Sequence, residues 1–289
     1  MGLRLKFNLA LLVACAIGLL VGAVIFRFVS IKNAQAQVLE NASIMIMAAN
    51  GIRDYTATDL VPLLPLEHDG KFVSELVPAY AAQQNFKTVQ ARFPGFSYRE
   101  PALNPTNLSD RAQDWEADII NLFRKEAERQ EFVTERDTPW GRTLYLARPV
   151  TIHSATCLAC HSTPQAAPAA LIRTFGSANG FGWKMNETIG AQFVSVPMTV
   201  PLQLAHDAFV SFLIIMVTTI AIVFIVLNLL LHYLVLEPVK KVTAVADAVS
   251  LGDENVEVYF KPGKDEISSL SVSFNRMRES LRQAMKMLK

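Results

Sequence analysis

Two cysteines and a histidine lie within five residues of one another in the stretch Cys157-Leu-Ala-Cys160-His161. The chain of 289 residues has three cysteines in all, and the third, Cys15, lies in an apolar run. Thiols and an imidazole at this spacing suit four kinds of site: half of a zinc site, a redox-active pair, a structural disulfide or the attachment site of a c-type haem.

The surrounding residues favour haem attachment. Structural zinc needs four ligands. His153 could be a third one beside the two cysteines, but no fourth is evident. A thioredoxin-like pair needs a βαβ pattern that is missing here, and a disulfide between Cys157 and Cys160 leaves His161 unexplained. A haem c accounts for all three residues, because each thiol adds across one vinyl group and the histidine becomes the proximal iron ligand. We therefore predict one covalent haem c on Cys157, Cys160 and His161.

Other contacts to such a haem are less determined. The thioether of Met45 or Met47 could be the sixth iron ligand, although for either one taken alone a core methionine that fills a gap is the favoured interpretation. Arg53 and Arg148 are candidates to bind the anionic propionates, with ordinary surface charge as the alternative.

Two apolar runs indicate membrane-spanning helices. Hydrophobic residues make up 51% of the chain and charged residues 18%, a balance typical of membrane proteins. A bilayer core about 30 Å thick requires about 20 apolar residues in a helix, which predicts spans over residues 8–30 and 208–234. Ala34-Gln35-Ala36 leaves cleavage of the first run as a signal peptide open, but the distance to this site favours an uncleaved anchor.

Basic residues that flank the two runs predict the orientation. Arg4 and Lys6 precede the first run, and Lys240 and Lys241 follow the second. By the positive-inside rule both ends are cytoplasmic and residues 31–206 lie outside the bacterial inner membrane, where covalent haem attachment takes place. The net charge of +1 gives no support for a nucleic-acid partner.

Residues 31–206 combine helical and strand-like patterns. A long helix is expected up to about Tyr55, and "DRAQDWEADIINLFRKEAERQ" forms an amphipathic helix, with Asp110 and Gln113 resembling a capping box. "TLYLARPV" and "IGAQFVSVPM" have the composition of strands and flank the cysteine motif. This order predicts an α+β sensor-like domain.

The region after Glu237-Pro238 has heptad character. Apolar residues recur at intervals of three and four, at Ile267, Leu270, Phe274, Met277, Leu281, Ala284 and Leu288. Short helices with such stripes cannot bury them alone, so we expect a homodimer.

Several motifs in this order resemble the bacterial c-type haem domain family, long catalogued as a domain of unknown function. They are "IRDYT", "ALNPTN", "WEADII", "LYLARPV", "CLACH", "APAALI" and "GFGWKMNETIGAQFVSVPM", within about residues 35–203. The resemblance implies a PAS-like fold, one covalent haem on Cys157, Cys160 and His161, and a distal ligand from the first long helix, which leaves Met45 and Met47 both open. In the tail, "EPVKKVTAVADAVSLGD" and "DEISSLSVSFNRMRESL" resemble the two helices of a HAMP linker over about residues 231–284. This resemblance implies an all-α cytoplasmic dimer, with the domain at 235–289.

Two functions follow from these expectations. The first is a membrane-bound haem c sensor of redox state or a diatomic gas, which relays a signal through the HAMP dimer to a separate cytoplasmic output protein. The alternative is a membrane-tethered c-type cytochrome that passes electrons to a redox partner; a small-molecule receptor with a structural haem is a weaker third. An enzyme is not expected, because the sequence offers no nucleophile–base pair, phosphate loop or carboxylate dyad.

Overall fold

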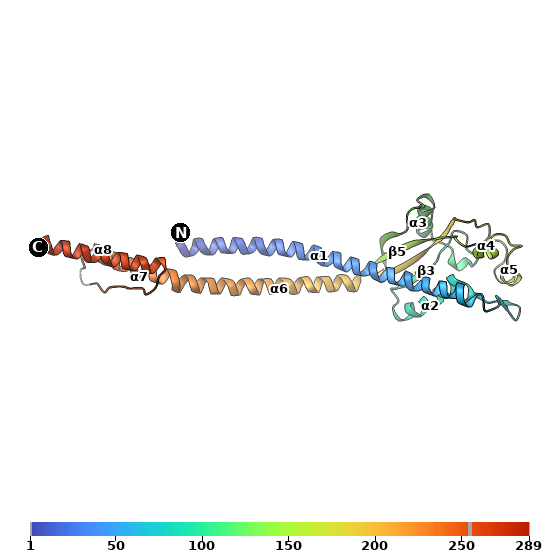
Figure 1. Ribbon diagram of the computed structural model, residues 1–289, viewed down its shortest axis with the longest axis horizontal. Coiled ribbons are helices and arrows are strands. Elements are labelled where there is room, and N and C mark those ends of the chain that lie inside the picture. The colour runs from blue at the N-terminus through green and yellow to red at the C-terminus, as the bar shows by residue number, and fades with distance from the viewer. Residues whose placement is uncertain (1, 254–255, 289) are drawn as a thin grey trace. The chain divides into compact units, whose positions relative to one another are not determined.

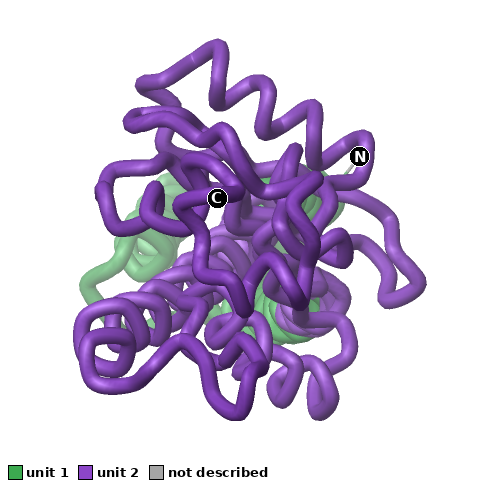
Figure 2. The backbone as a smooth tube through the Cα atoms, turned by 90° about the vertical axis from the view of Figure 1, so that its right-hand side faces the viewer, with its two compact units in different colours: residues 1–25, 210–289 green, residues 26–209 purple. Residues whose placement is uncertain are grey.

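The computed structural model describes residues 2–253 and 256–288. Glu254, Asn255 and Lys289 of the predicted HAMP range lie outside the described residues, as does the side chain of Leu288. The chain divides into two compact units, one made of residues 1–25 and 210–289 and the other of residues 26–209 (Figure 2).

The unit of residues 26–209 is a mixed α+β domain. Its elements are α1 (Leu3–Tyr55, which begins in the other unit), the π-helical turn η1 (Thr56–Leu60), β1 (Glu67–His68), β2 (Lys71–Phe72), η2 (Ser74–Leu76), α2 (Pro78–Arg92), β3 (Ser97–Arg99), η3 (Leu108–Asp110), α3 (Asp114–Lys125), β4 (Phe132–Thr138), β5 (Gly141–Thr151), α4 (Ala155–His161), α5 (Ala169–Phe175) and β6 (Thr188–Pro197). The predicted end of the long helix at Tyr55 and both predicted strands are confirmed.

An antiparallel sheet with the strand order β3-β6-β5-β4 forms the centre of this domain. Leu144 and Val194 point to one face, where they pack with α1 and α2. Ala147 and Phe193 point to the other face, where they pack against α3. Helices therefore cover both faces of the sheet, as the ribbon shows (Figure 1).

Small and β-branched residues let α1 lie close against the sheet. Ala34, Val38, Ala42, Ile46 and Ala49 are buried and recur every three or four residues, which places them on one side of the helix. On the opposite sheet face, α3 begins with a capping box of Gln113 and Glu116. The prediction of a box at Asp110 and Gln113 was wrong, because Asp110 belongs to the separate turn η3.

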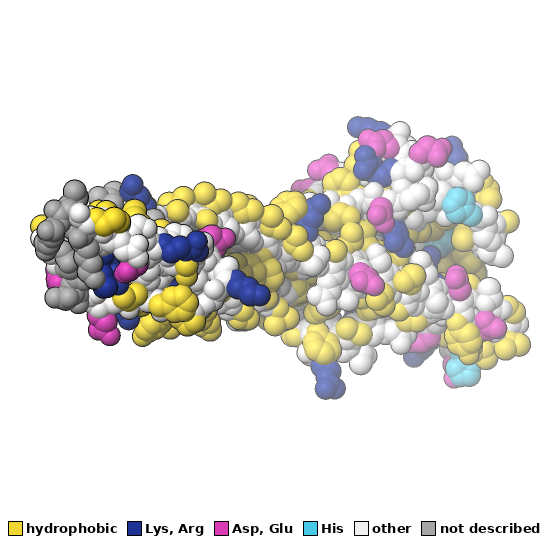
Figure 3. Space-filling model, turned by 60° about the vertical axis from the view of Figure 1, so that its left-hand side comes forward, with side chains coloured by type: hydrophobic (Ala, Val, Ile, Leu, Met, Phe, Trp, Pro, Cys, Tyr) yellow, Lys and Arg dark blue, Asp and Glu magenta, His cyan; other side chains and the backbone are white. Residues whose placement is uncertain are grey.

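The other unit contains the apolar helical segments. It comprises the start of α1, most of α6 (Thr199–Leu230), the π-helical turn η4 (Leu231–Leu236), α7 (Glu237–Ser250) and α8 (Glu266–Leu288). Both α1 and α6 are long and apolar enough to cross a membrane, judged by length and composition. Hydrophobic side chains line the surface of these segments (Figure 3).

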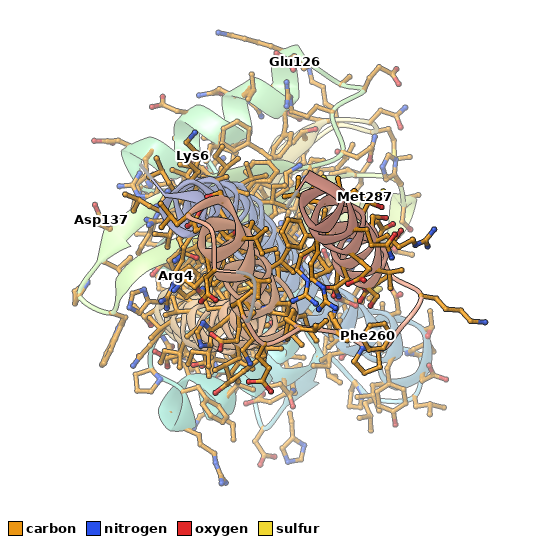
Figure 4. The ribbon with its side chains drawn as sticks, turned by 90° about the vertical axis from the view of Figure 1, so that its left-hand side faces the viewer. Arg4, Lys6, Glu126, Asp137, Phe260 and Met287 are labelled. Atoms are coloured by element: carbon orange, nitrogen blue, oxygen red, sulfur yellow. The ribbon has the colours of Figure 1, made fainter. Side chains whose placement is uncertain are left out.

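Two helices and an extended connector form the C-terminal part of this unit. Val242 and Val245 of α7 are buried, whereas Leu270, Met277 and Leu281 of α8 are exposed in the single chain. The connector between α7 and α8 lies along α8, since Asn275 Nδ2 and Ser271 Oγ of this helix both donate to the carbonyl of Tyr259 at 2.9 Å. Figure 4 shows this end of the chain, with Phe260 on the connector and Met287 near the end of α8.

Candidate functional site

The cysteine motif lies on the short helix α4, in the segment that joins β5 to β6. Ser154 begins this helix, and its side chain accepts a hydrogen bond from the backbone N–H of Thr156. Residues three and four apart share a helix face, so Cys157, Cys160 and His161 project from the same side. Both thiols are free and half-buried. Burial raises the pKa of the Cys160 thiol, and the neighbouring Cys157 adds to this, so Cys160 is a thiol at neutral pH.

The ring of His161 is fixed by a short hydrogen bond to Gly180, a longer one of 3.4 Å between Nδ1 and Thr106 Oγ1, and one stacked ring. Its Nδ1 lies 2.8 Å from the carbonyl oxygen of Gly180. A carbonyl only accepts, so Nδ1 carries the proton and Nε2 keeps its lone pair. Trp183 stacks on the imidazole with a centroid distance of 3.9 Å and an angle of 15°. Burial lowers the pKa of His161 although the bond to Gly180 opposes this, which favours the neutral form that binds metals.

A loop from the opposite side of the site holds the carbonyl of Gly180 in place. Asn104 Oδ1 accepts from the N–H of Gly180 at 3.3 Å, and Asn104 Nδ2 donates to the carbonyl of Phe181 at 3.4 Å. Gly180 has a φ of +83°, and a Cβ at this position would lie 2.7 Å from Thr106 Cα. Only glycine therefore fits here without displacement of the Thr106 backbone.

Asn104, Thr106 and Gly180 were not predicted as site residues. Asn104 and Thr106 belong to the "ALNPTN" motif and Gly180 to the glycine-rich "GSANGFGW" turn, but the pattern of neither motif shows that they meet. The only signal in the sequence was that both motifs occur, in this order and with this composition. The hydrogen bonds between them explain why the site needs both motifs.

A buried polar network lies between α1 and the sheet next to the site. Arg53 of α1 pairs with Glu100, and Tyr98 donates a 2.6 Å hydrogen bond to the same carboxylate. Gln192 Nε2 then donates to Tyr98 Oη at 2.9 Å and to Asn50 Oδ1 at 2.6 Å. Burial raises the pKa of Tyr98, and the nearby Glu100 adds to this, so the phenol stays protonated.

Arg53 is the cation of this network. Burial acts to lower the pKa of Arg53, but Glu100 and Tyr98, with smaller contributions, outweigh burial and the pKa is raised. Of the arginines predicted as propionate contacts, Arg53 is therefore held on α1 by a buried carboxylate.

The remaining predicted residues have other surroundings. Arg148 of β5 pairs with Glu131 at 3.4 Å. Met45 is half-buried and packs against the core between α1 and the sheet, whereas 59% of the Met47 surface is exposed. Met45 precedes Arg53 by eight residues, which is about 12 Å along a helix. Among the described residues, no group of three or more His, Cys, Asp or Glu side chains is arranged to hold a metal ion without a cofactor.

The fold and the site define a class of protein: an α+β domain with a Cys-x-x-Cys-His helix, bounded by two long apolar helices and followed by a helical C-terminal region. The comparisons with known proteins name the family. The Tll0287-like family matches residues 31–197, and the chain belongs to it. A HAMP domain matches residues 230–283.

One solved structure is also similar. It is the crystal structure of the cyanobacterial heme-protein Tll0287, with 18% sequence identity, a TM-score of 0.44 and coverage of 56% of this chain and 95% of that chain. No curated protein matches this chain.

Proposed function

We propose that this protein is a membrane-bound haem c sensor, with a PAS-like haem domain outside the bacterial inner membrane and a HAMP dimer in the cytoplasm. One observation carries the proposal: the domain that bears the Cys-x-x-Cys-His motif packs its sheet on α1, the same unbroken helix that contains the first apolar segment. The family match and the HAMP match support it, since a haem-protein family and a signal relay occur in one chain.

The donor groups of the site fit a covalently bound haem. Cys157 and Cys160 are free thiols on one helix face and would hold the group through two thioether bonds. His161 would bind the iron through Nε2, because Nδ1 is already engaged with Gly180. When bound, haem would supply one-electron redox chemistry and, at an open sixth position, a site for a diatomic gas.

Two contacts in the structure support a choice among the weaker candidates. Arg53 would contact a propionate while it keeps Glu100 as a partner, whereas Arg148 would have to leave Glu131. Met45 is the better candidate for the sixth ligand, since its side chain faces the interior of the domain and that of Met47 faces away.

Both apolar helices join the domain without a flexible linker. α1 has no break from Leu3 to Tyr55, and α6 begins at Thr199, two residues after the end of β6 at Pro197. A change at the site that shifts α1 or β6 would therefore bias the packing of the HAMP dimer. A cytoplasmic output domain or protein would read this packing.

The first experiment tests for the haem. The full chain is expressed with a cytochrome-maturation system, separated on a denaturing gel and stained for haem. We expect a stained band that is lost in the Cys157→Ala/Cys160→Ala variant and kept in the control Cys15→Ala. An unstained wild-type band of normal abundance would overturn the proposal.

The second experiment separates the sensor from the electron carrier. Spectra of the reduced protein are recorded with and without carbon monoxide, and cross-linking between single cysteines at Leu281 reports the HAMP packing in each state. A sensor changes the cross-linking with oxidation state or with carbon monoxide. Reversible reduction with unchanged cross-linking in all states would instead identify an electron carrier.

A further inference from the structure

A pocket with four polar side chains lies between α1 and α6, inside the unit that contains the apolar segments. Its volume is about 410 Å³. Arg4 and Asn8 come from α1, whereas Asn228 and His232 come from the end of α6 and from the turn η4. Figure 4 looks onto this end of the unit and labels Arg4. The rest of the lining is apolar and consists of Phe224, Ile225 and Leu229.

The position of the pocket along the two helices corresponds to one edge of a bilayer. Arg27 follows Arg4 by 23 residues, which is about 35 Å along a helix, and the apolar core of a bilayer is about 30 Å thick. His232 follows Asp207 by 25 residues, about 38 Å. Polar residues therefore bracket the apolar core on both helices, and Arg4 and His232 lie at the depth of the cytoplasmic headgroups. This step rests on the membrane placement in the proposed function.

The charge of the lining suits an anion. Arg4 is the only Arg or Lys among the lining residues, which include no Asp or Glu. Within the described part of the chain no carboxylate pairs with Arg4. A guanidinium binds a phosphate group through two parallel hydrogen bonds, so Arg4 can hold a phosphate at this depth.

The amide of Asn8 indicates a ligand that also has a hydrogen-bond donor. Asn8 Oδ1 is buried and has no hydrogen-bond partner among the described residues. An amide oxygen without a partner is costly next to hydrocarbon, where water cannot replace the missing donor. The amide of Asn228 is already engaged, since its Nδ2 donates to the carbonyl of Phe224 at 3.0 Å. A headgroup with a hydroxyl supplies a phosphate for Arg4 and a donor for Asn8.

The apolar part of the lining favours a lipid over a free anion. Ile225 is 58% exposed and Leu229 51%, and Ile222, on the same face of α6 one turn further into the span, is 57% exposed. An acyl chain can lie along this face while the headgroup occupies the polar part of the pocket. Basic pockets between membrane helices on the cytoplasmic side bind anionic headgroups in this way.

We propose that the pocket binds an anionic phospholipid with a hydroxyl in its headgroup, such as phosphatidylglycerol, with the phosphate on Arg4 and the hydroxyl on Asn8. The turn η4 begins at Leu231, next to the pocket, and α7 follows it directly. π-helical turns are frequent at functional sites. A bound lipid would hold the direction in which the second span enters the HAMP match at residues 230–283. The lipid composition of the inner leaflet is then a second input to the HAMP domain, besides the haem site.

Native mass spectrometry of the full-length chain tests this site. The chain is reconstituted in nanodiscs of phosphatidylcholine with the same small fraction of either phosphatidylglycerol or phosphatidylethanolamine, and the lipids that remain bound after release are counted. Arg4→Gln removes the phosphate contact and Asn8→Leu the amide. The matched control Lys6→Gln removes the same charge two residues away, about 200° around the helix and outside the lining. Recovery in the membrane fraction reports the insertion of each variant.

We expect the wild type to retain phosphatidylglycerol several times more often than phosphatidylethanolamine. Arg4→Gln and Asn8→Leu should lose most of this preference, and Lys6→Gln should keep it. No preference in the wild type, or equal losses in Arg4→Gln and Lys6→Gln, would overturn the lipid site.

Two further outcomes separate this inference from its alternatives. Retention of soluble glycerol 3-phosphate in pure phosphatidylcholine nanodiscs, lost in Arg4→Gln, would identify a free phosphate ester as the ligand and overturn the assignment to a lipid. A wild-type chain that is absent from the membrane fraction would overturn the membrane placement of the proposed function. A chain that is inserted but shows no lipid preference overturns the lipid site alone.

Discussion

His161 Nδ1 and the carbonyl oxygen of Gly180 are 2.8 Å apart, although 19 residues separate them in the chain. The bond sets the tautomer of the imidazole and leaves the lone pair of Nε2 available to a ligand. It depends on an unusual backbone, because Gly180 has a φ of +83° and Thr106 occupies the space where a side chain would lie. The position of the His161 ring therefore depends on this glycine.

The variant Gly180→Ala tests this dependence. A Cβ at Gly180 would lie 2.0 Å from Thr106 Oγ1 and would push the loop away from His161. Gly182→Ala is the control, since its φ of +82° is equally unfavourable for alanine but nothing lies within 4 Å. We expect Gly182→Ala to cost about 1 kcal/mol of stability, and Gly180→Ala to cost more and to change the haem spectrum. Equal stability and equal spectra in the two variants would contradict this role.

The Arg53–Glu100 pair predicts a large loss of stability on removal of one partner. The Glu100 side chain is only 5% exposed, so Arg53→Ala leaves a buried carboxylate without its cation. We expect a loss of about 3 kcal/mol in the free energy of unfolding, measured by urea titration of the solubilised chain. The control is Arg124→Ala, which breaks the exposed Arg124–Glu187 pair and costs about 1 kcal/mol or less.

A second variant separates charge from packing at this pair. Glu100→Gln removes the charge of the carboxylate and keeps an oxygen that accepts from Tyr98. The double variant Arg53→Ala/Glu100→Gln is expected to be more stable than Arg53→Ala alone. If both are equally unstable, the loss comes from packing of the Arg53 side chain and not from the unpaired charge.

Local patterns explain which parts were predictable from the sequence. The end of α1 at Tyr55 and the strands β5 and β6 follow from periodicity and composition within a few residues. Cys157, Cys160 and His161 were predicted as a haem attachment site because their spacing in the sequence already has a chemical meaning. Arg53 was proposed as a propionate contact, and the structure adds its pairing with the buried Glu100.

Contacts between distant segments were not predictable. Asn104 contacts Phe181, 77 residues away in the chain, and Arg53 contacts Glu100, 47 residues away. Neither contact produces a periodic pattern in the sequence from which it could be predicted. The same holds for the choice between Met45 and Met47. The two residues are neighbours in sequence, and only the side on which α1 meets the sheet separates them.

Replacement of each methionine tests the sixth ligand. We expect Met45→Ala to change the spectrum of the reduced haem protein and to open the iron to carbon monoxide, because Met45 faces the domain interior. Met47→Ala serves as the control and should leave the spectrum unchanged, since its side chain is exposed. A wild-type spectrum in both variants would remove the thioethers of α1 from the candidates.

Glu116 of α3 predicts a defined pH dependence of stability. Its carboxylate accepts from Arg99 at 3.0 Å and from the N–H of Gln113 at 2.8 Å, and Arg136 lies nearby. Burial nevertheless raises its pKa above the ordinary value of 4.5. The folded domain therefore binds this proton more tightly than the unfolded chain does. Its contribution to the free energy of unfolding is greatest at low pH and falls as the pH rises through the raised pKa.

The variant Glu116→Gln removes this titration and keeps the shape of the side chain. We expect the wild type to lose stability relative to Glu116→Gln as the pH is raised from about 4 to about 7, because the buried carboxyl must give up its proton in the folded state. Midpoints of urea unfolding of the solubilised chain, followed by tryptophan fluorescence at each pH, measure the difference. Glu128→Gln, at an exposed position, is the control, and its urea midpoints should change with pH in the same way as those of the wild type. If Glu116→Gln also runs parallel, Glu116 does not titrate with folding and the burial of α3 against the sheet is looser than the structure shows.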